Sequence, residues 1–155
     1  MQNNDILRRI RYTFDYRDEK MVSIFAHANH ETSEEEVKKW LKKEDHNAFV
    51  ALSDKLLATF LNGLIIERRG KKDGPQPVPE DRLDNNIVFR KLKIALNFKD
   101  VDILETLETG GKVISKHELS AFFRKTTQAQ YRPCQDQVLR NFLQGLQMKF
   151  RDNAE

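Results

Sequence analysis

The sequence predicts an all-α protein made of two tandem copies of a roughly four-helix unit, related by pseudo-twofold symmetry and sharing one core. Three observations predict this fold. Residues 3–69 align without a gap on residues 85–151. Apolar residues recur in both copies at the three- and four-residue spacing of amphipathic helices. No segment alternates apolar and polar residues between turn signals, as a half-buried strand does.

The internal repeat rests on identity as well as on pattern. A shift of 82 residues makes 14 of 67 positions identical, whereas ordinary composition would give roughly four by chance. Between the copies, residues 70–84 contain three of the four prolines of the chain. Proline removes a backbone donor and disfavours helix before it, so we expect an extended linker. The predicted organisation is therefore a repeat at 3–69, a linker at 70–84 and a repeat at 85–151.

The first two helices of each copy are predicted from their apolar stripes and polar starts. The first helix is expected from Asn4 to Tyr16, with the paired asparagines of each copy supplying the N-cap. The second helix is expected to start near Asp18 and near Asp100, where an aspartate would cap it and suit the positive end of the dipole.

The third and fourth helices have sharper signals. Ser33 and Ser115 each begin an S-x-x-E capping box, so a helix should start at both places. The last helix of the first copy is expected from about Asp54 to Arg69. Gly63 and Gly145 fall inside the last helices, where glycine costs roughly 0.5–1 kcal/mol relative to alanine. We expect another backbone to pass close to each glycine, at a helix crossing between the two copies.

Several phrases of the sequence resemble the YehS-like family. They are NNDILRRIRY at residues 3–12, FLNGLI at 60–65, and CQD at 134–136 followed by FLQGL at 142–146. The resemblance covers almost the whole chain. It implies a small bacterial protein that carries two copies of a domain of unknown function, and it implies no activity.

Composition narrows the class of protein. With 39% apolar and 33% charged residues, the chain has the balance of a soluble globular protein. A single cysteine, Cys134, excludes a disulfide framework within the chain and Cys-rich zinc patterns. No apolar run is long enough to span a membrane, and the N-terminal residues lack the pattern of a signal peptide. We therefore expect a cytoplasmic protein without a membrane partner.

The sequence points to no catalytic residue, metal site or cofactor. His27 and His30 are three residues apart and could share a helix face. A metal site would need further ligands, and the second copy has Thr109 and Lys112 in place of the two histidines. Cys134 aligns with Leu52, which favours a buried side chain over a working thiol. Glycine-rich phosphate loops and nucleophile elbows are absent from the sequence. Asp54 and Asp136 precede apolar helical runs, where capping explains them.

Repeated basic residues remain as candidates for binding. They lie mostly opposite the apolar stripe of the first helix in each copy, so we expect them to face solvent. If the copies pack with pseudo-twofold symmetry, the two basic stripes could form one surface. Together with the paired asparagines, the candidate binding residues are Asn4, Arg8, Arg9, Arg11, Asn86, Arg90, Lys91 and Lys93.

Two function classes follow from these residues. The first is a non-enzymatic binding or regulatory module that recognises a protein or a small ligand, because structure repeats without repeated catalytic chemistry. The alternative is a nucleic-acid-binding regulator that uses the basic stripes, since residues 85–155 carry a net charge of +4. Against the alternative, the first turn of the third helix holds Glu34, Glu35 and Glu36. An enzyme would need a cleft that gathers Asn4, Asn86 and Asp18 or Asp100.

Overall fold

A computed structural model of the chain describes residues 1–152, which contain eight α-helices and no strand. The first repeat comprises α1 (Asn3–Phe14), α2 (Asp18–His27), α3 (Glu34–Leu41) and α4 (Asp54–Arg69). The second repeat comprises α5 (Asn85–Leu96), α6 (Asp100–Thr109), α7 (Lys116–Phe122) and α8 (Asp136–Gln147). A π-helical turn, η1 (Met148–Asp152), continues α8. Within the described residues, no helix has the length and apolar character that crossing a membrane requires.

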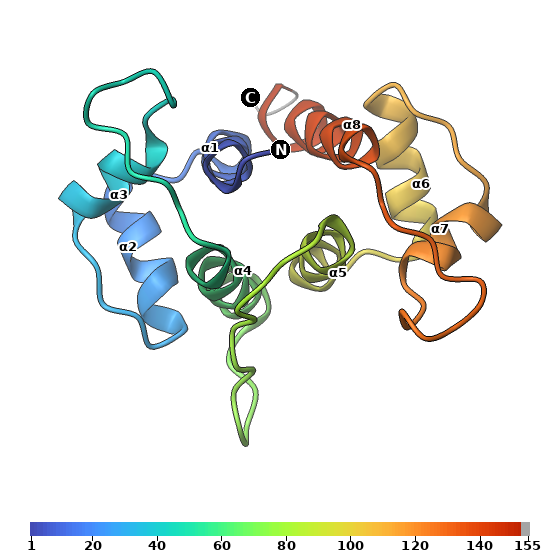
Figure 1. The fold of residues 1–155 in the computed structure, drawn as a ribbon, viewed down its shortest axis with the longest axis horizontal. Helices are drawn as coiled ribbons and strands as arrows, with labels where there is room; N and C mark the ends of the chain where they lie inside the picture. Colours follow the sequence, from blue (N-terminus) through green and yellow to red (C-terminus); the bar gives the residue numbers. More distant parts are fainter. Residues whose placement is uncertain (153–155) are drawn as a thin grey trace.

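The two repeats pack through four central helices (Figure 1). Helices α1, α4, α5 and α8 lie in the middle of the molecule, with α2 and α3 on one side and α6 and α7 on the other. Between the repeats, α4 packs against α5 and α8 packs against α1. Exchanging the repeats turns one of these pairs into the other, which is the predicted pseudo-twofold relation. We call the junction formed by these two pairs the seam.

One hydrophobic core runs through both repeats. The buried apolar side chains of α1 to α8 form a single continuous cluster, so neither repeat has a core that ends at the seam. Phe60 packs against Phe25 with ring centroids 5.2 Å apart, and Phe142 packs against Phe89 with centroids 4.6 Å apart. Because burial of apolar area is the main force in folding, a shared core makes the repeats stabilise each other. The predicted all-α duplicated fold is confirmed.

Equivalent hydrogen bonds join the repeats at the start of each last helix. Oδ2 of Asp54 accepts the backbone N–H of Leu83 at 2.8 Å. Oδ2 of Asp136 accepts a hydrogen bond from the backbone nitrogen of Met1 at 2.7 Å. Met1 and Leu83 are 82 residues apart, as are Asp54 and Asp136. Each aspartate therefore holds the residue that lies two positions before the other repeat, rather than capping its own helix.

A second pair of equivalent bonds lies at the opposite end of the last helices. The guanidinium of Arg69 donates to the carbonyl of Ile94 at 3.0 Å, and that of Arg151 donates to the carbonyl of Tyr12 at 3.1 Å. Both arginines were among the identical positions of the two copies, and both reach the end of a first helix across the seam. The pseudo-twofold relation thus extends to individual polar contacts.

The close crossings at Gly63 and Gly145 lie inside each repeat. A Cβ atom on Gly63 would be 2.0 Å from the carbonyl oxygen of Ile24 in α2, and a Cβ on Gly145 would be 2.0 Å from that of Thr106 in α6. The predicted close backbone is therefore present, but its predicted place at the seam is wrong. The physical reason is that α4 and α8 cross α2 and α6 with one face and meet the other repeat with the opposite face.

The helix starts agree with the sequence more closely than their caps do. Ser33 and Ser115 cap α3 and α7 as predicted, since their hydroxyls accept from the N–H of Glu36 and Glu118 at 3.1 and 3.0 Å. The asparagines do not cap α1 and α5, because they lie inside the helices; Gln2 and Asp84 precede them. Likewise, Asp18 and Asp100 are the first helical residues and not the caps.

The linker departs from the compact body. Residues 70–84 contain neither helix nor strand and leave α4 as a protruding loop before they return to α5 (Figure 1). The side chain of Gln76 donates to the carbonyls of Lys72 and Gly74 and holds the two sides of this loop together. Leu83, at the end of the linker, packs against the core.

Candidate functional site

Asn4 is a buried structural residue of the first repeat. Its Nδ2 donates to the carbonyls of Trp40 at 2.8 Å and Val50 at 2.9 Å. Its Oδ1 accepts the N–H of Leu52 at 3.0 Å. The amide thereby ties α1 to both ends of the loop between α3 and α4.

Asn86 does the same in the second repeat. Its three bonds go to the carbonyls of Phe122 and Arg132 and to the N–H of Cys134, at 3.0, 2.9 and 2.8 Å. Asn4 and Asn86 are 2% and 4% exposed, and each bonds only within its own repeat. The cleft that an enzymatic site would need to gather both amides is therefore not formed by these residues.

The basic residues form two triplets, which are Arg8, Arg9 and Arg11 in the first repeat and Arg90, Lys91 and Lys93 in the second. The first arginine of each triplet contacts the end of the third helix in its own repeat. Arg8 donates to the carbonyl of Lys42 at 2.8 Å and forms an ion pair with Asp5. Arg90 donates to the carbonyl of Phe123 at a longer 3.4 Å, and its side chain is exposed. Arg90 is therefore the freer of the two guanidinium groups.

The second residue of each triplet crosses the seam. Arg9 donates to Oε1 of Gln144 in α8 at 2.8 Å, and Lys91 donates to Oδ1 of Asn62 in α4 at 2.6 Å. Asn62 and Gln144 are themselves equivalent positions. Lys91 also pairs with Glu80 at 3.0 Å, which leaves its side chain 11% exposed. These two cations are directed at the other repeat.

The third residue of each triplet is also half-buried. The Lys93 ammonium lies 3.7 Å from Asp100 and 4.5 Å from the centre of the Phe123 ring. Nε of Arg11 is buried and finds no hydrogen-bond partner within residues 1–152. The expectation that the triplets face solvent is thus wrong for most of them. Arg9 and Lys91 contact the other repeat. Arg8 and Lys93 contact residues of their own repeat. Nor do the two triplets form one surface, since α1 and α5 lie diagonally across the four central helices (Figure 1).

The histidines and the cysteine, which were considered as metal ligands and as a nucleophile, pack against or lie beside other residues of the fold. His27 lies 3.0 Å from Glu67, and the His30 ring packs against Phe25. Residues 1–152 contain no group of three or more metal-ligating side chains. Cys134 is 4% exposed, and burial together with the carboxylates of Asp136 and Asp84 raises the pKa of its thiol to about 12. At neutral pH this thiol therefore stays protonated and is a poor nucleophile.

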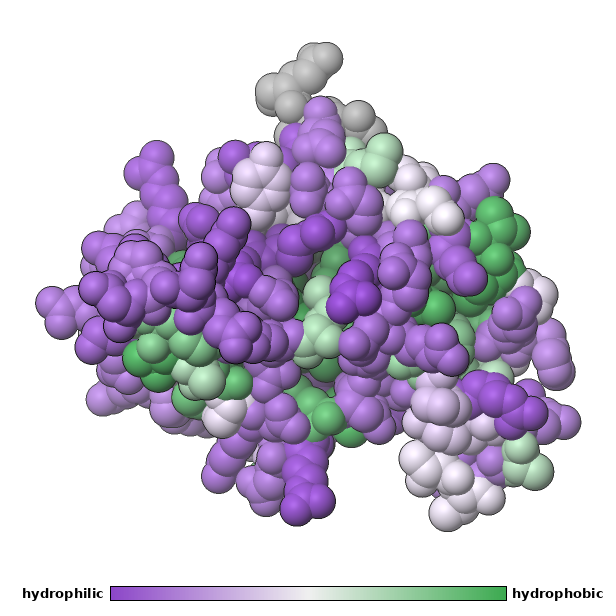
Figure 2. All heavy atoms as spheres, turned by 45° about the horizontal axis from the view of Figure 1, so that its top comes forward, coloured by the Kyte–Doolittle hydropathy of each residue, from purple (hydrophilic) through white to green (hydrophobic). Residues whose placement is uncertain are grey.

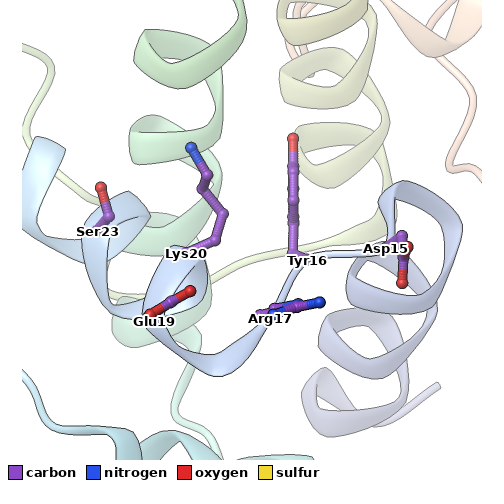
Figure 3. Close-up of a pocket in the computed structure, with 6 residues that line it drawn as sticks. All are labelled: Asp15, Tyr16, Arg17, Glu19, Lys20 and Ser23. Atoms are coloured by element: carbon purple, nitrogen blue, oxygen red, sulfur yellow. The ribbon is translucent and has the colours of Figure 1, made fainter.

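The surface carries several hollows between polar side chains. One face of the molecule is mostly hydrophilic, with apolar side chains exposed only in small separate areas (Figure 2). An open hollow of about 410 Å³ lies at the turn from α1 to α2 and is lined by Asp15, Tyr16, Arg17, Glu19, Lys20 and Ser23. In it Tyr16 and Lys20 point in the same direction away from the turn (Figure 3). The hollow is lined by residues of both charge signs. One of its cations, Lys20, already forms an ion pair with Glu67 at 3.2 Å.

Two further hollows occupy equivalent places in the two repeats. Each lies between the start of the first helix and the loop that follows the third helix. The first groove has a volume of about 950 Å³ and is lined by Met1, Gln2, Asp5, Arg8, Lys43, Glu44, Asp45 and Arg140. The second groove has a volume of about 410 Å³ and is lined by residues equivalent to six of these, which are Asp84, Ile87, Arg90, Lys125, Thr126 and Thr127.

The two grooves differ in charge. Arginine and lysine are kept at two equivalent positions, but the three carboxylates of the first groove are replaced in the second by Ile87, Thr126 and Thr127. The second groove gains Arg124 and Tyr131 in its wall. Sequence reasoning singled out Arg8 and Arg90 but missed the grooves, because their loop residues belong to no helical stripe. The loss of carboxylates at aligned positions was the signal that could have found them.

The comparisons with known proteins agree with the duplication. A family model described as "Protein of unknown function (DUF1456)" matches residues 3–70 and again residues 85–152. The chain is 43% identical over 147 residues to the uncharacterized protein YehS of Escherichia coli (strain K12), and the match covers 94% of each chain. No solved structure is significantly similar. The resemblance to the YehS-like family is confirmed.

Proposed function

Because the chain belongs to the DUF1456 family, whose description gives no function, we propose that it is a non-enzymatic binding or regulatory module that recognises a protein or a small ligand. The observation that carries this proposal is the pair of equivalent grooves. Both repeats keep a hollow with an arginine and a lysine in its wall, while the other side chains around it differ. Such divergence is what two binding sites of different specificity on one scaffold would show.

The shifted pKa values of Asp136 and Glu67 have structural causes. The groups with shifted pKa values are Glu67, Tyr131, Cys134 and Asp136. Hydrogen bonds donated by the nitrogen of Met1 and by Asn85 lower the pKa of Asp136, which joins the repeats. Burial raises the pKa of Glu67, which joins α2 to α4, but hydrogen bonds from His27 and Lys20 outweigh this and lower the pKa. Each of these two shifts therefore accompanies a structural contact and not a pair of acid and base in a cleft.

The test blocks each groove with a bulky side chain. Asp45 and Thr127 are equivalent, exposed positions, so Asp45→Trp fills the first groove and Thr127→Trp fills the second. Lys116→Trp, at an exposed position on α7 outside both grooves, is the matched control. Each purified protein is incubated with metabolites and soluble proteins from Escherichia coli, and the retained molecules are identified by mass spectrometry.

We expect at least one molecule to be enriched on the wild-type protein and on the control, and to be lost from one groove variant. If every molecule enriched on the wild-type protein were retained equally by both groove variants, the grooves would not be binding sites. The proposal would then be wrong.

A nucleic-acid-binding regulator is the second candidate. The observation in its favour is that the cations of the second groove lie within residues 85–155, which carry a net charge of +4. Binding through phosphate contacts would weaken steeply with salt. We would then expect bulk RNA or DNA to bind at low salt, and Arg90→Ala with Lys125→Ala to reduce both the affinity and its salt dependence. An absence of binding at low salt would eliminate this candidate.

A further inference from the structure

The second groove has positive charge that the protein itself does not neutralise. Arg90, Arg124 and Lys125 line it, and none of the three forms an ion pair with any residue in the described range 1–152. In the first groove, by contrast, Arg8 is paired with Asp5. Ile87 replaces that aspartate in the second groove, so the guanidinium of Arg90 has only the long contact with the carbonyl of Phe123.

The one carboxylate in the second groove, that of Asp84, accepts a backbone hydrogen bond. Oδ1 of Asp84 accepts the N–H of Ile87 at 2.8 Å and thereby caps α5. Two hydroxyl groups, those of Thr126 and Thr127, stand where the first groove has Glu44 and Asp45. A set of two guanidinium groups, one ammonium and two hydroxyls therefore surrounds the hollow with hydrogen-bond donors.

We propose that the second groove binds a phosphate group carried by a small molecule of about mononucleotide size. Guanidinium groups bind phosphate oxygens through two parallel hydrogen bonds, and a lysine adds a point charge. Three cations match the charge of a phosphate monoester better than that of a single carboxylate. A volume of about 410 Å³ lies within the range of small-molecule sites. Tyr131 offers an aromatic wall for the part of the ligand that carries the phosphate.

This inference deepens the proposed binding function, because it assigns a ligand class to one of the two grooves. The first groove is not included, since the carboxylates of Asp5, Glu44 and Asp45 line it and would repel a phosphate. The duplicated scaffold would thus use one groove for a phosphorylated ligand and leave the other to a different partner.

The experiment exchanges the loop residues that distinguish the grooves. Thr126→Glu with Thr127→Asp gives the second groove the residues of the first, and both positions are exposed. Glu44→Thr with Asp45→Thr is the reciprocal control. Binding of inorganic phosphate, adenosine monophosphate, adenosine and a short single-stranded DNA is followed through backbone amide shifts in NMR titrations, which also report whether each variant is folded.

We expect adenosine monophosphate to shift the amides of residues 84–90 and 124–131, with adenosine far weaker. The Thr126→Glu, Thr127→Asp variant should lose about tenfold or more in affinity, because the two added carboxylates repel the phosphate. The reciprocal variant should bind as the wild-type protein does. Shifts outside the groove, or equal affinity in both variants, would overturn the inference.

Two other outcomes would also overturn it. Single-stranded DNA that binds while both phosphate probes do not would indicate a nucleic-acid surface. If the phosphate probes failed while Thr127→Trp still abolished capture of another molecule, the proposed binding function would stand and the phosphate assignment would be wrong.

Discussion

Gly63 and Gly145 let two helices cross at backbone contact in each repeat. The carbonyl of Ile24 in α2, and that of Thr106 in α6, occupy the space where a larger residue would carry its Cβ atom. The cost of a mid-helix glycine, up to about 1 kcal/mol, is offset by the close packing that it permits. This is a residue-scale requirement, because only the absence of one carbon atom satisfies it.

Gly63→Ala and Gly145→Ala should each destabilise the protein, although alanine favours helix. Forcing a Cβ against a backbone carbonyl requires the helices to separate, and overpacking of this kind costs about 1–3 kcal/mol beyond the propensity gain. Urea unfolding gives the free energy of each variant. Lys55→Ala, on an exposed position of α4, serves as the control and should change stability little. A glycine variant as stable as the wild-type protein would contradict the close crossing.

The importance of the paired asparagines could be predicted from the sequence, but their hydrogen-bond partners could not. Their repetition in the sequence correctly marked Asn4 and Asn86 as special. Capping was the local interpretation, but their actual partners lie 36 to 48 residues further along the chain. Long-range hydrogen bonds depend on how loops return to a helix, and no local pattern encodes that return.

At the scale of elements, helix starts with a local hydrogen-bond motif were predictable. Both S-x-x-E boxes begin helices, and the predicted range of the last helix, Asp54–Arg69, agrees with α4. The second copy departs from the first at its end, where α8 gives way to η1 after Gln147. That difference was not predicted, although Gln147 replaces the apolar Ile65 at the place where α8 ends.

Ser33→Ala and Ser115→Ala should each reduce stability by about 1 kcal/mol. The reason is that the N–H of Glu36 or Glu118 loses the hydroxyl that accepts it. Thermal unfolding of the two variants beside the wild-type protein measures the effect, with Ser23→Ala, at a half-buried position in the hollow of Figure 3, as a comparison. Melting that stays unchanged in both variants would mean that these caps do not hold the helix starts.

The packing of α2 on α4 should depend on pH through Glu67. Burial raises the pKa of Glu67, but hydrogen bonds and charges from His27 and Lys20 outweigh it and hold the pKa below the ordinary value of 4.5. A lowered pKa in the folded state stabilises the protein above pH 4.5, and this contribution is lost as the pH falls through the lowered value. Glu67→Gln should therefore cost about 0.5–1 kcal/mol at neutral pH.

The same variant should show a flatter decline of unfolding free energy as the pH falls below 4.5. Urea unfolding at a series of pH values measures this, and Glu108→Gln, at an exposed position of α6, provides the control. An unaltered decline in Glu67→Gln would show that this carboxylate does not link stability to pH.

At the scale of the whole molecule, duplication explains both the symmetry and its breaks. The shift of 82 residues predicted two alike halves with one core, and the seam repeats its bonds at Asp54 and Asp136 and at Arg69 and Arg151. The partial burial of the basic triplets was not predicted. A helix face opposite one apolar stripe can still contact the other repeat, as at Arg9 and Lys91, or the end of another helix of its own repeat, as at Arg8. The grooves were missed for a related reason, since they arise only when a loop meets a helix start.

Because the two repeats share one core, we expect them to unfold together in one cooperative transition. Trp40 is the only tryptophan, lies in the first repeat, and is 5% exposed against Phe25. Its fluorescence therefore reports the first repeat, whereas far-ultraviolet circular dichroism reports the helices of both. Gly145→Ala disturbs only the crossing of α6 and α8 in the second repeat.

The most direct measurement is urea unfolding of Gly145→Ala followed by both signals in the same samples. If the two repeats form one cooperative unit, the Trp40 transition moves to lower urea together with the circular dichroism transition, and the two midpoints coincide. If instead the Trp40 midpoint stays at its wild-type value while circular dichroism shows an earlier step, the repeats are independent domains and the account of the seam is wrong.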